Sequence, residues 1–128
     1  MLELIREKKR DWWEVENLFD LCFAPGREAL SSYRLRDNII PIIELCYLLR
    51  DETEAVVGAV RFWEVQVAGK PVLLLGPIAI HPTRQGEGLG GYLMYESLNV
   101  ATQSGWTRVM LVGDISYYGR FGFTKLSN

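Results

Sequence analysis

The stretch LLLGPIAIHPTRQGEGLGGYLMYESLNVATQSG, from Leu73 to Gly105, decides how this chain folds. It opens within an apolar run, Val72 to Ile80, whose length and branched residues predict a buried strand. His81-Pro82 ends that strand, because proline has no N–H group for a sheet ladder. Glycines then recur before a helical pattern, which Gly105 ends. The stretch therefore predicts a strand, a glycine-rich turn and a helix.

A glycine-rich turn directly before a helix favours the binding of an anion. The first N–H groups of a helix have no intrahelical acceptor, and the helix dipole attracts negative charge there. Gly86, Gly88 and Gly90 carry no side chains that would keep a ligand away from these amides. A hydrogen bond to a charged oxygen contributes roughly 1.5–3 kcal/mol. Three or four such bonds are enough to hold a pyrophosphate without a lysine.

Two common phosphate motifs do not fit this turn. A P-loop ends in Gly-Lys-Ser/Thr, and no such ending follows Gly86. The dinucleotide fingerprint needs G-x-G-x-x-G soon after the first strand of a βαβ unit, whereas here the strand comes late in the chain. A nucleotide-binding enzyme is therefore disfavoured.

The spacing Gln85-x-x-Gly88-x-Gly90 after a strand resembles the acetyl-CoA pyrophosphate loop of the GNAT N-acetyltransferase superfamily. A second block, GDISYYGRFGF from Gly113 to Phe123, is similar to the tyrosine-bearing segment that closes the cofactor site in that superfamily. In this form the block resembles a bacterial subgroup of predicted N-acetyltransferases. The resemblance covers Ala55 to Phe123 well and the first fifty residues only loosely.

The order of elements predicts an α/β (α+β) fold in one domain, residues 1–128. By resemblance it is a GNAT-like mixed, mostly antiparallel sheet with helices on both faces and one parallel βαβ crossover. The periodicity predicts strands at Leu2–Arg6, Ile42–Leu49, Ala55–Val67, Val72–Ile80 and Trp106–Val112 and helices at residues 12–23 and 27–36. Asp11 and Glu14 suggest a capping box at the start of the first helix. A helical turn is expected to hold Tyr117 and Tyr118.

The resemblance implies at least one more strand after Phe123, where only Thr124 to Asn128 follow. Three explanations stay open: the chain is naturally short, it is a shortened piece, or a neighbouring chain completes the sheet. An uncovered strand edge favours association. We therefore expect a homodimer.

Composition excludes several classes of function. The 128 residues are enough for one core, and 48% of them are hydrophobic, with four Trp and six Tyr. A formal net charge of −2 argues against nucleic-acid binding, and no apolar run is long enough to cross a membrane. A lone histidine leaves no multi-histidine metal site, so no metal is expected. Cys22 and Cys46 have no metal or redox spacing, which fits buried thiols in a reducing cytoplasm.

The resemblance implies an acetyl-CoA-dependent transferase in which the amine attacks the thioester directly. The backbone of Ile78, Ala79 and Ile80 would pair with the pantetheine arm, and one amide there would face the thioester oxygen as an oxyanion hole. The pyrophosphate would lie against Arg84, Gln85, Gly86, Glu87, Gly88, Leu89, Gly90 and Gly91. Arg84 is interpreted either as a phosphate ligand or as a solvated surface arginine.

Tyr118 matches the superfamily tyrosine that lies five residues before the final Phe and is proposed to protonate the CoA thiolate. A phenol has a pKa of about 10, so it carries its proton at neutral pH. Tyr117 is the alternative acid, and packing without proton transfer is the alternative role for Tyr118. Arg120 and Phe121 are interpreted as residues that fix the turn and the core.

Glu64 is the candidate general base. Glu64 could face the cleft directly or through a water. Asp114 could orient the tyrosine turn or the amine, or simply cap the turn that follows. The function predicted is transfer of an acetyl group from acetyl-CoA to a small-molecule or protein amine. The alternative is a non-catalytic module that binds or senses acyl-CoA.

Overall fold

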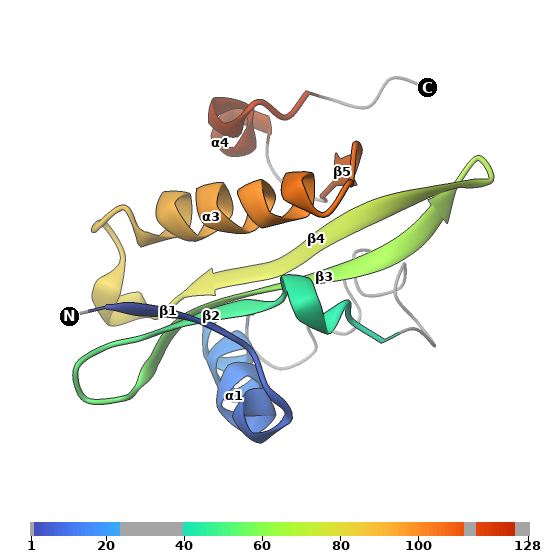
Figure 1. The fold of residues 1–128 in the computed structure, drawn as a ribbon. Coiled ribbons are helices and arrows are strands. Elements are labelled where there is room, and N and C mark those ends of the chain that lie inside the picture. The colour runs from blue at the N-terminus through green and yellow to red at the C-terminus, as the bar shows by residue number, and fades with distance from the viewer. Residues whose placement is uncertain (1, 24–39, 112–114, 125–128) are drawn as a thin grey trace.

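The computed structural model describes residues 2–23, 40–111 and 115–124. Within these residues a five-stranded sheet has the order β1-β2-β3-β4-β5 (Figure 1). The strands are β1 (Glu3–Arg6), β2 (Tyr47–Arg50), β3 (Val56–Val67), β4 (Lys70–Ile80) and β5 (Val109–Met110). The first four pair antiparallel, and β5 pairs parallel to β4 through Leu73↔Val109 and Leu74↔Met110. The predicted fold class, with its one parallel crossover, is confirmed.

Helices cover both faces of this sheet (Figure 1). The α-helices are α1 (Trp12–Phe23), α3 (Leu89–Gln103) and α4 (Ile115–Tyr118). Short 3₁₀ turns are η1 (Lys9–Asp11), η3 (Ile43–Leu45), η4 (Pro82–Arg84) and η5 (Gly119–Phe121). The predicted first helix, the helix after the glycine turn and the turn holding Tyr117 and Tyr118 are confirmed. The helix predicted at 27–36 lies outside the described residues.

Two predictions near the N-terminal half were wrong. Ile42 to Leu49 is not one strand, because η3 takes up Ile43–Leu45 and β2 begins at Tyr47. The Ile42 N–H donates to the Phe62 carbonyl at 2.8 Å, and the chain then turns to bury Leu45. An apolar run of this length does not by itself separate a strand from a buried turn.

The capping box at Asp11 and Glu14 is the second correction. Asp11 is the last residue of η1, and its carboxylate accepts from the Lys8 N–H at 2.9 Å. Both carboxylates also accept from the guanidinium of Arg50 on β2, at 2.8 Å in each case. The local cap therefore joins Asp11 to Lys8 rather than to Glu14, and the pairing with Arg50 attaches α1 to the sheet.

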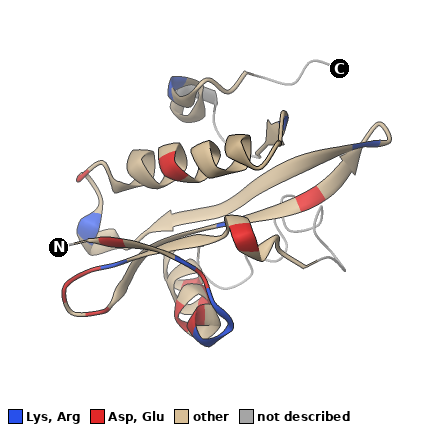
Figure 2. Cartoon of the chain, in the orientation of Figure 1, with Lys and Arg blue, Asp and Glu red and all other residues tan. Residues whose placement is uncertain are grey.

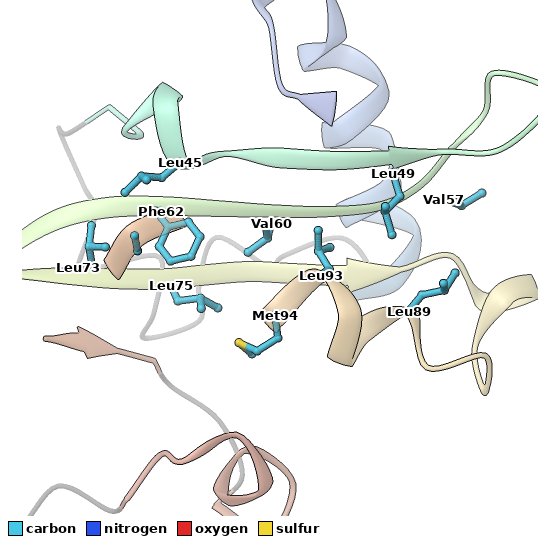
Figure 3. Packing of buried hydrophobic residues seen from close by; sticks show 11 residues of the cluster. Leu45, Leu49, Val57, Val60, Phe62, Leu73, Leu75, Leu89, Leu93 and Met94 are labelled. Carbon is cyan, nitrogen blue, oxygen red and sulfur yellow. The ribbon is translucent and has the colours of Figure 1, made fainter. Parts of the chain in front are cut away.

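The core has one apolar layer on each face of the sheet. Under α3, Leu93 and Met94 pack on the sheet residues Val60, Phe62 and Leu75 (Figure 3). Under α1, the packing residues are Val15, Leu18, Phe19, Leu48, Val56, Ala59 and Ala79. Residues of β3 alternate between the two layers, which follows from the twofold period of a strand. The two layers hold the end of β4 and the start of α3 in fixed positions.

An irregularity in β4 shapes its last residues. Val60 pairs with Ile78 and Phe62 pairs with Leu75, so two residues of β4, Gly76 and Pro77, face one residue of β3. The Trp63 indole N–H donates to the Gly76 carbonyl at 2.6 Å. Such a bulge bends a strand and redirects the residues that follow it. The bulge therefore changes the direction of Ile78 to Ile80, which lie beyond Leu74, the last residue of β4 that pairs with β5 in the described part of the chain.

Candidate active site

A pocket of about 570 Å³ lies where the end of β4, the glycine turn, the start of α3 and the α4–η5 segment meet. It brings together parts of the chain that are separated by some forty residues in sequence. The residues that line it are Ile78, Ala79, Ile80, Arg84, Gln85, Gly86, Gly88, Leu89, Gly90, Gly91, Met94, Tyr117, Tyr118, Arg120 and Phe121. Most of the residues that the sequence assigned to cofactor binding or acid catalysis are therefore in one place.

The N-terminus of α3 opens into this pocket. Gly88 precedes the helix in the left-handed conformation, with φ 77°, and no side chain caps the helix. The first intrahelical hydrogen bond runs from the Tyr92 N–H to the Gly88 carbonyl at 3.1 Å. The N–H groups of Leu89, Gly90 and Gly91 precede it and have no intrahelical acceptor. Open amides at a helix N-terminus fit an anion such as a diphosphate.

The start of α3 lies close to the α4–η5 segment at two glycines. A Cβ atom on Gly90 would lie 3.3 Å from the Tyr117 hydroxyl oxygen. A Cβ atom on Gly91 would lie 3.6 Å from the Phe121 ring. Longer side chains at either position would fill the space between α3 and the α4–η5 segment. The glycines thus keep a passage open beside the free amides.

At the end of β4, the strand edge that faces away from β3 offers backbone groups to a ligand. Among the described residues β5 pairs only with Leu73 and Leu74, so β4 from Ile78 to Ile80 has a strand partner on the β3 side alone. An unpaired strand edge presents N–H and C=O groups that an extended amide-containing chain can pair with. The Ile80 carbonyl already receives long contacts of 3.4 Å from the Gln85 side-chain amide and the Cys22 thiol.

Two tyrosines form the wall opposite the loop. The rings of Tyr117 and Tyr118 meet edge to face, with centroids 4.9 Å apart. Tyr118 is half-buried, and burial together with the neighbouring Tyr117 raises the pKa of its hydroxyl above the ordinary value. Tyr117 is 40% exposed and lies under the Arg120 guanidinium, 4.5 Å from its ring centroid. Tyr118 is therefore a hydroxyl that keeps its proton at neutral pH.

Arg84 and Glu87 differ from the rest of the predicted loop. Glu87 is exposed and does not line the pocket, and both of its carboxylate oxygens accept from the Arg84 Nε, at 2.9 and 3.1 Å. Arg84 also lies 3.7 Å from a carboxylate oxygen of Asp51 in the β2–β3 turn. Arg84 does line the pocket, so its charge is near the open amides but already paired. The carboxylate of Glu87 is therefore paired with Arg84, and only its backbone N–H is left as a candidate donor to a phosphate.

Glu64 is not brought into the site. It is exposed on β3 opposite Leu73, whereas the pocket begins at Ile78 on β4, beyond the bulge. At roughly 3.3 Å per strand residue that is a separation of well over 10 Å along the sheet. Asp114 lies outside the described residues.

The sequence analysis missed the contributions of Met94, Arg120 and Phe121 to the pocket wall. Arg120 and Phe121 were interpreted as residues that fix the turn, and Arg120 does donate from Nε to the Tyr117 carbonyl at 3.0 Å. They lie in the same block as Tyr117 and Tyr118, so their proximity to the tyrosines was the available signal. Met94 gave no signal, because a methionine on an apolar helix face is ordinary core.

With this geometry in view, comparison with known proteins identifies the class. Residues 12–123 match the Acetyltransferase (GNAT) family, and the chain belongs to this family. It is 31% identical over 111 residues to the uncharacterized N-acetyltransferase YhbS of Escherichia coli K12. That alignment covers 85% of this chain and 65% of YhbS, so the chain spans somewhat less than two thirds of this relative.

Solved structures agree in fold. The crystal structure of E. coli YhbS in complex with CoA is similar to this chain with a TM-score of 0.79 and 27% identity, covering 97% of this chain and 68% of that one. A GNAT family acetyltransferase from Brucella melitensis in complex with acetyl-CoA gives a TM-score of 0.78 at 26% identity, covering 98% and 84%.

The part of the chain that the structure describes contains neither a membrane-spanning helix nor a candidate metal site. No described helix has the length and apolar character that crossing a membrane requires. The same residues contain no cluster of three or more His, Cys, Asp or Glu side chains that could hold a metal ion.

Proposed function

We propose that this protein transfers an acetyl group from acetyl-CoA to the amine of an acceptor. The observation that carries the proposal is the uncapped N-terminus of α3, which opens into one pocket with the unpaired edge of β4 and Tyr118. Family membership and the CoA and acetyl-CoA complexes of similar proteins support it.

The chain's own residues would divide the cofactor between two surfaces. The N–H groups from Gln85 to Gly91 would hold the pyrophosphate, with Arg84 beside them. The backbone of Ile78, Ala79 and Ile80 would hold the pantetheine arm and direct one N–H at the thioester oxygen. Bound acetyl-CoA supplies a thioester whose acyl carbon is open to attack by a neutral amine. The protein's part is positioning and charge stabilisation.

Tyr118 would give its proton to the departing CoA sulfur. Its raised pKa keeps the hydroxyl protonated throughout the neutral range, and its half-buried place in the pocket wall holds it near the unpaired edge of β4. Tyr117 is the alternative donor, because it lines the same pocket and its hydroxyl lies beside Gly90. Comparison of the two Phe variants decides between them.

Removal of the acceptor's proton is the remaining step. Glu64 was the candidate, but its position opposite Leu73, well over 10 Å along the sheet from Ile78, is farther from the pocket than one water bridges. A Glu64→Gln variant with unchanged kcat/KM would eliminate it. An amine that is already neutral when it binds needs no protein base.

Two measurements test the proposed function. Isothermal titration with acetyl-CoA should give saturable, one-to-one binding. Release of the free CoA thiol should then depend on an amine, tested across a panel of small amines, aminosugars and peptide N-termini. Binding without thiol release for any amine would favour the alternative, a module that binds or senses acyl-CoA. No binding at all would overturn both.

Two further proposals concern the protein's surroundings. We propose a reducing, cytoplasmic location, supported by the free thiols of Cys22 and Cys46. We also propose association as a homodimer, supported by the short β5 strand at the sheet edge, because unpaired edges attract a second chain. Light scattering after size-exclusion chromatography tests the second proposal, and a monomer at micromolar concentration would overturn it.

A further inference from the structure

The turn that leads from β1 into α1 carries three cations and two exposed tryptophans. Lys8, Lys9 and Arg10 are all exposed, and none of them forms an ion pair with a carboxylate in the described part of the chain. Trp12 and Trp13 follow in the first turn of α1, with 42% and 71% of their surfaces exposed. Together these residues form the basic tryptophan patch. Figure 2 shows the Lys and Arg residues gathered at this turn, and the proposed chemistry does not use them.

The acids of this region are paired inside the molecule. Asp11 and Glu14 both accept from the guanidinium of Arg50 on β2, at 2.8 Å. Glu7 is buried against Arg61 on β3 and accepts from it at 2.9 and 3.1 Å. Internal partners thus neutralise these carboxylates, whereas the cations of the basic tryptophan patch are left at the surface. The surface potential there is positive although the whole chain has a formal net charge of −2, so an anionic partner fits it.

The two indole rings of the patch are held in place by the protein itself. The guanidinium of Arg61, which is buried, lies 5.9 Å from the centroid of the Trp12 ring. Trp13 meets Trp12 edge to face, with ring centroids 4.9 Å apart. Because the rings are already ordered, little side-chain entropy is lost when a partner binds them. Tryptophan favours the boundary between water and lipid, where its ring leaves water and its N–H group stays hydrated.

The place of the patch favours a flat partner. It lies at the outer edge of the molecule, on the side of the sheet opposite α3 (Figure 1). Neither the pocket described above nor a second pocket of about 350 Å³ along α3 includes any of its residues. Peptides bind in grooves or along strand edges, and single nucleic-acid strands follow a groove. A bilayer needs no groove, since cations pair with lipid phosphates at its surface and tryptophans enter the interface. The exposed acid Asp20, about two turns further along α1, confines such a contact to the helix start.

We propose that the basic tryptophan patch binds the surface of an anionic lipid bilayer. The cations Lys8, Lys9 and Arg10 lie at the lipid phosphates, and the rings of Trp12 and Trp13 lie in the interface. This contact stays on the surface and needs no helix that crosses the bilayer. Since α1 and α3 cover opposite faces of the sheet, the open amides of α3 lie away from the bilayer (Figure 1). The inference does not rest on the proposed function, because no residue of the patch lines the active-site pocket.

Sedimentation with lipid vesicles tests the role of the cations. Wild type should bind vesicles made of equal parts of phosphatidylcholine and phosphatidylglycerol about tenfold more tightly than vesicles of phosphatidylcholine alone, and salt should reduce this preference. The Lys9→Gln, Arg10→Gln double variant should bind the mixed vesicles about 25-fold more weakly, because each cation near an anionic surface contributes roughly a factor of five. Lys70→Gln, Arg108→Gln is the matched control, since it also removes one exposed lysine and one exposed arginine, and its affinity should stay within about twofold of wild type.

A second pair of variants tests the tryptophans. Trp13→Ala should weaken binding to the mixed vesicles about fivefold, because an exposed indole no longer enters the interface. Tyr95→Ala is its matched control, since Tyr95 is an aromatic residue that is 66% exposed on α3, across the sheet from the patch, and it should leave vesicle binding unchanged. All variants should unfold at the urea concentration of wild type, so that a loss of vesicle binding is not a loss of the fold.

Several results would overturn the inference. Equal binding of neutral and mixed vesicles by wild type, or no binding of either, would exclude an anionic bilayer as the partner. An equal loss in the two double variants would show an effect of net charge rather than of the patch. A polyglutamate peptide or a single-stranded oligonucleotide that bound more tightly than the mixed vesicles, with the binding lost in Lys9→Gln, Arg10→Gln, would assign the patch to an acidic protein or a nucleic acid. Failure to bind acetyl-CoA would contradict the proposed function and leave the vesicle result as it stands.

Discussion

The two long helices of this protein begin in opposite ways. α1 starts in a dense set of charges: Asp11 and Glu14 both bind the guanidinium of Arg50, and the Asp11 carboxylate also takes the Lys8 N–H. α3 starts at Gly88 with no capping side chain and no acid in its first turn. Both helices pack on the same sheet, one on each face (Figure 1). Both helices pack on the sheet through apolar side chains, so they differ in the groups that contact their first turns.

The comparison teaches that a helix N-terminus can serve either stability or binding. Around α1 the protein supplies its own negative charge, which satisfies the positive end of the helix and fixes it to β2. Around α3 it supplies glycines and a pocket, and leaves the amides for a ligand. The buried cluster under α1, where Arg61 pairs with Glu7 and Glu16, continues the first pattern. If this contrast is right, changes at the start of α3 should affect ligand binding, and changes around α1 should affect stability.

The largest effect is expected at the open amides. Gly88→Val places a branched side chain at the loop that should block two or three hydrogen bonds to phosphate, lowering acetyl-CoA affinity roughly 100-fold or more by titration calorimetry. Gly105→Val is the matched control at the other end of α3, because Gly105 also has a positive φ, 95°, and open space at its Cβ. It should share the backbone strain and bind normally. Equal affinities in the two variants would refute the loop assignment.

Breaking the buried cluster should affect stability and spare binding. Arg61 is 4% exposed, and its removal leaves the carboxylate of Glu7, 3% exposed, without its partner. Arg61→Leu should lower the free energy of unfolding by about 3–5 kcal/mol, measured by urea denaturation. The acetyl-CoA affinity of the folded fraction should stay within about twofold. In the comparison variant Arg84→Leu, stability should hardly change, whereas binding should weaken. Weaker binding in Arg61→Leu together with lower stability in Arg84→Leu would contradict the separation of stability from binding.

Loss of the hydroxyl of Tyr118, the proposed acid, should lower turnover without changing the affinity for acetyl-CoA. Tyr118→Phe should lower kcat about 100-fold in the thiol-release assay, the lower end for loss of a general acid. Tyr117→Phe, in the same wall, should lose far less. Because the pKa of Tyr118 is raised, wild-type turnover should not fall through loss of its proton until the pH is above about 10. Full activity in Tyr118→Phe would assign the role to another group.

The smallest effect is expected from the charges at the start of α1. Burial raises the pKa of Asp11, but bonds from the Lys8 N–H and Arg50 outweigh it, so the net pKa is lowered. The Glu14 pKa is lowered, chiefly by its hydrogen bond from Arg50. Groups with lowered pKa values stabilise the fold above their ordinary pKa, near 4, and this contribution is lost as the pH falls through the lowered values.

The Asp11→Asn, Glu14→Gln double variant should therefore be less stable at pH 7 by about 1 kcal/mol, since water screens the half-exposed Glu14. Its stability should also change less than that of wild type between pH 4 and pH 2, as followed by urea denaturation at each pH. A double variant that kept the acid sensitivity of wild type would place the titrating groups elsewhere.

Local patterns in the sequence predicted most of the regular elements and the glycine-rich turn before α3. The 3.6-residue period gave α1 its observed bounds. Gln85 to Gly91 could be recognised because a strand, glycines and a helix must be neighbours in sequence to form such a loop. Where a residue's role depended on a distant partner, the prediction was weaker: Asp11 binds Arg50, and Glu64 lies away from the pocket.

The sequence alone determined that this chain forms a mixed sheet with a crossover helix whose first amides are free of side chains, because those properties follow from short-range spacing. Only the tertiary structure decided what surrounds those amides. It brought Tyr117 and Phe121 from the C-terminal block against Gly90 and Gly91. Among the described residues it also gave Ile78 to Ile80 of β4 a strand partner on the β3 side alone. Such contacts depend on how layers pack over long sequence separations, and no local pattern encodes them.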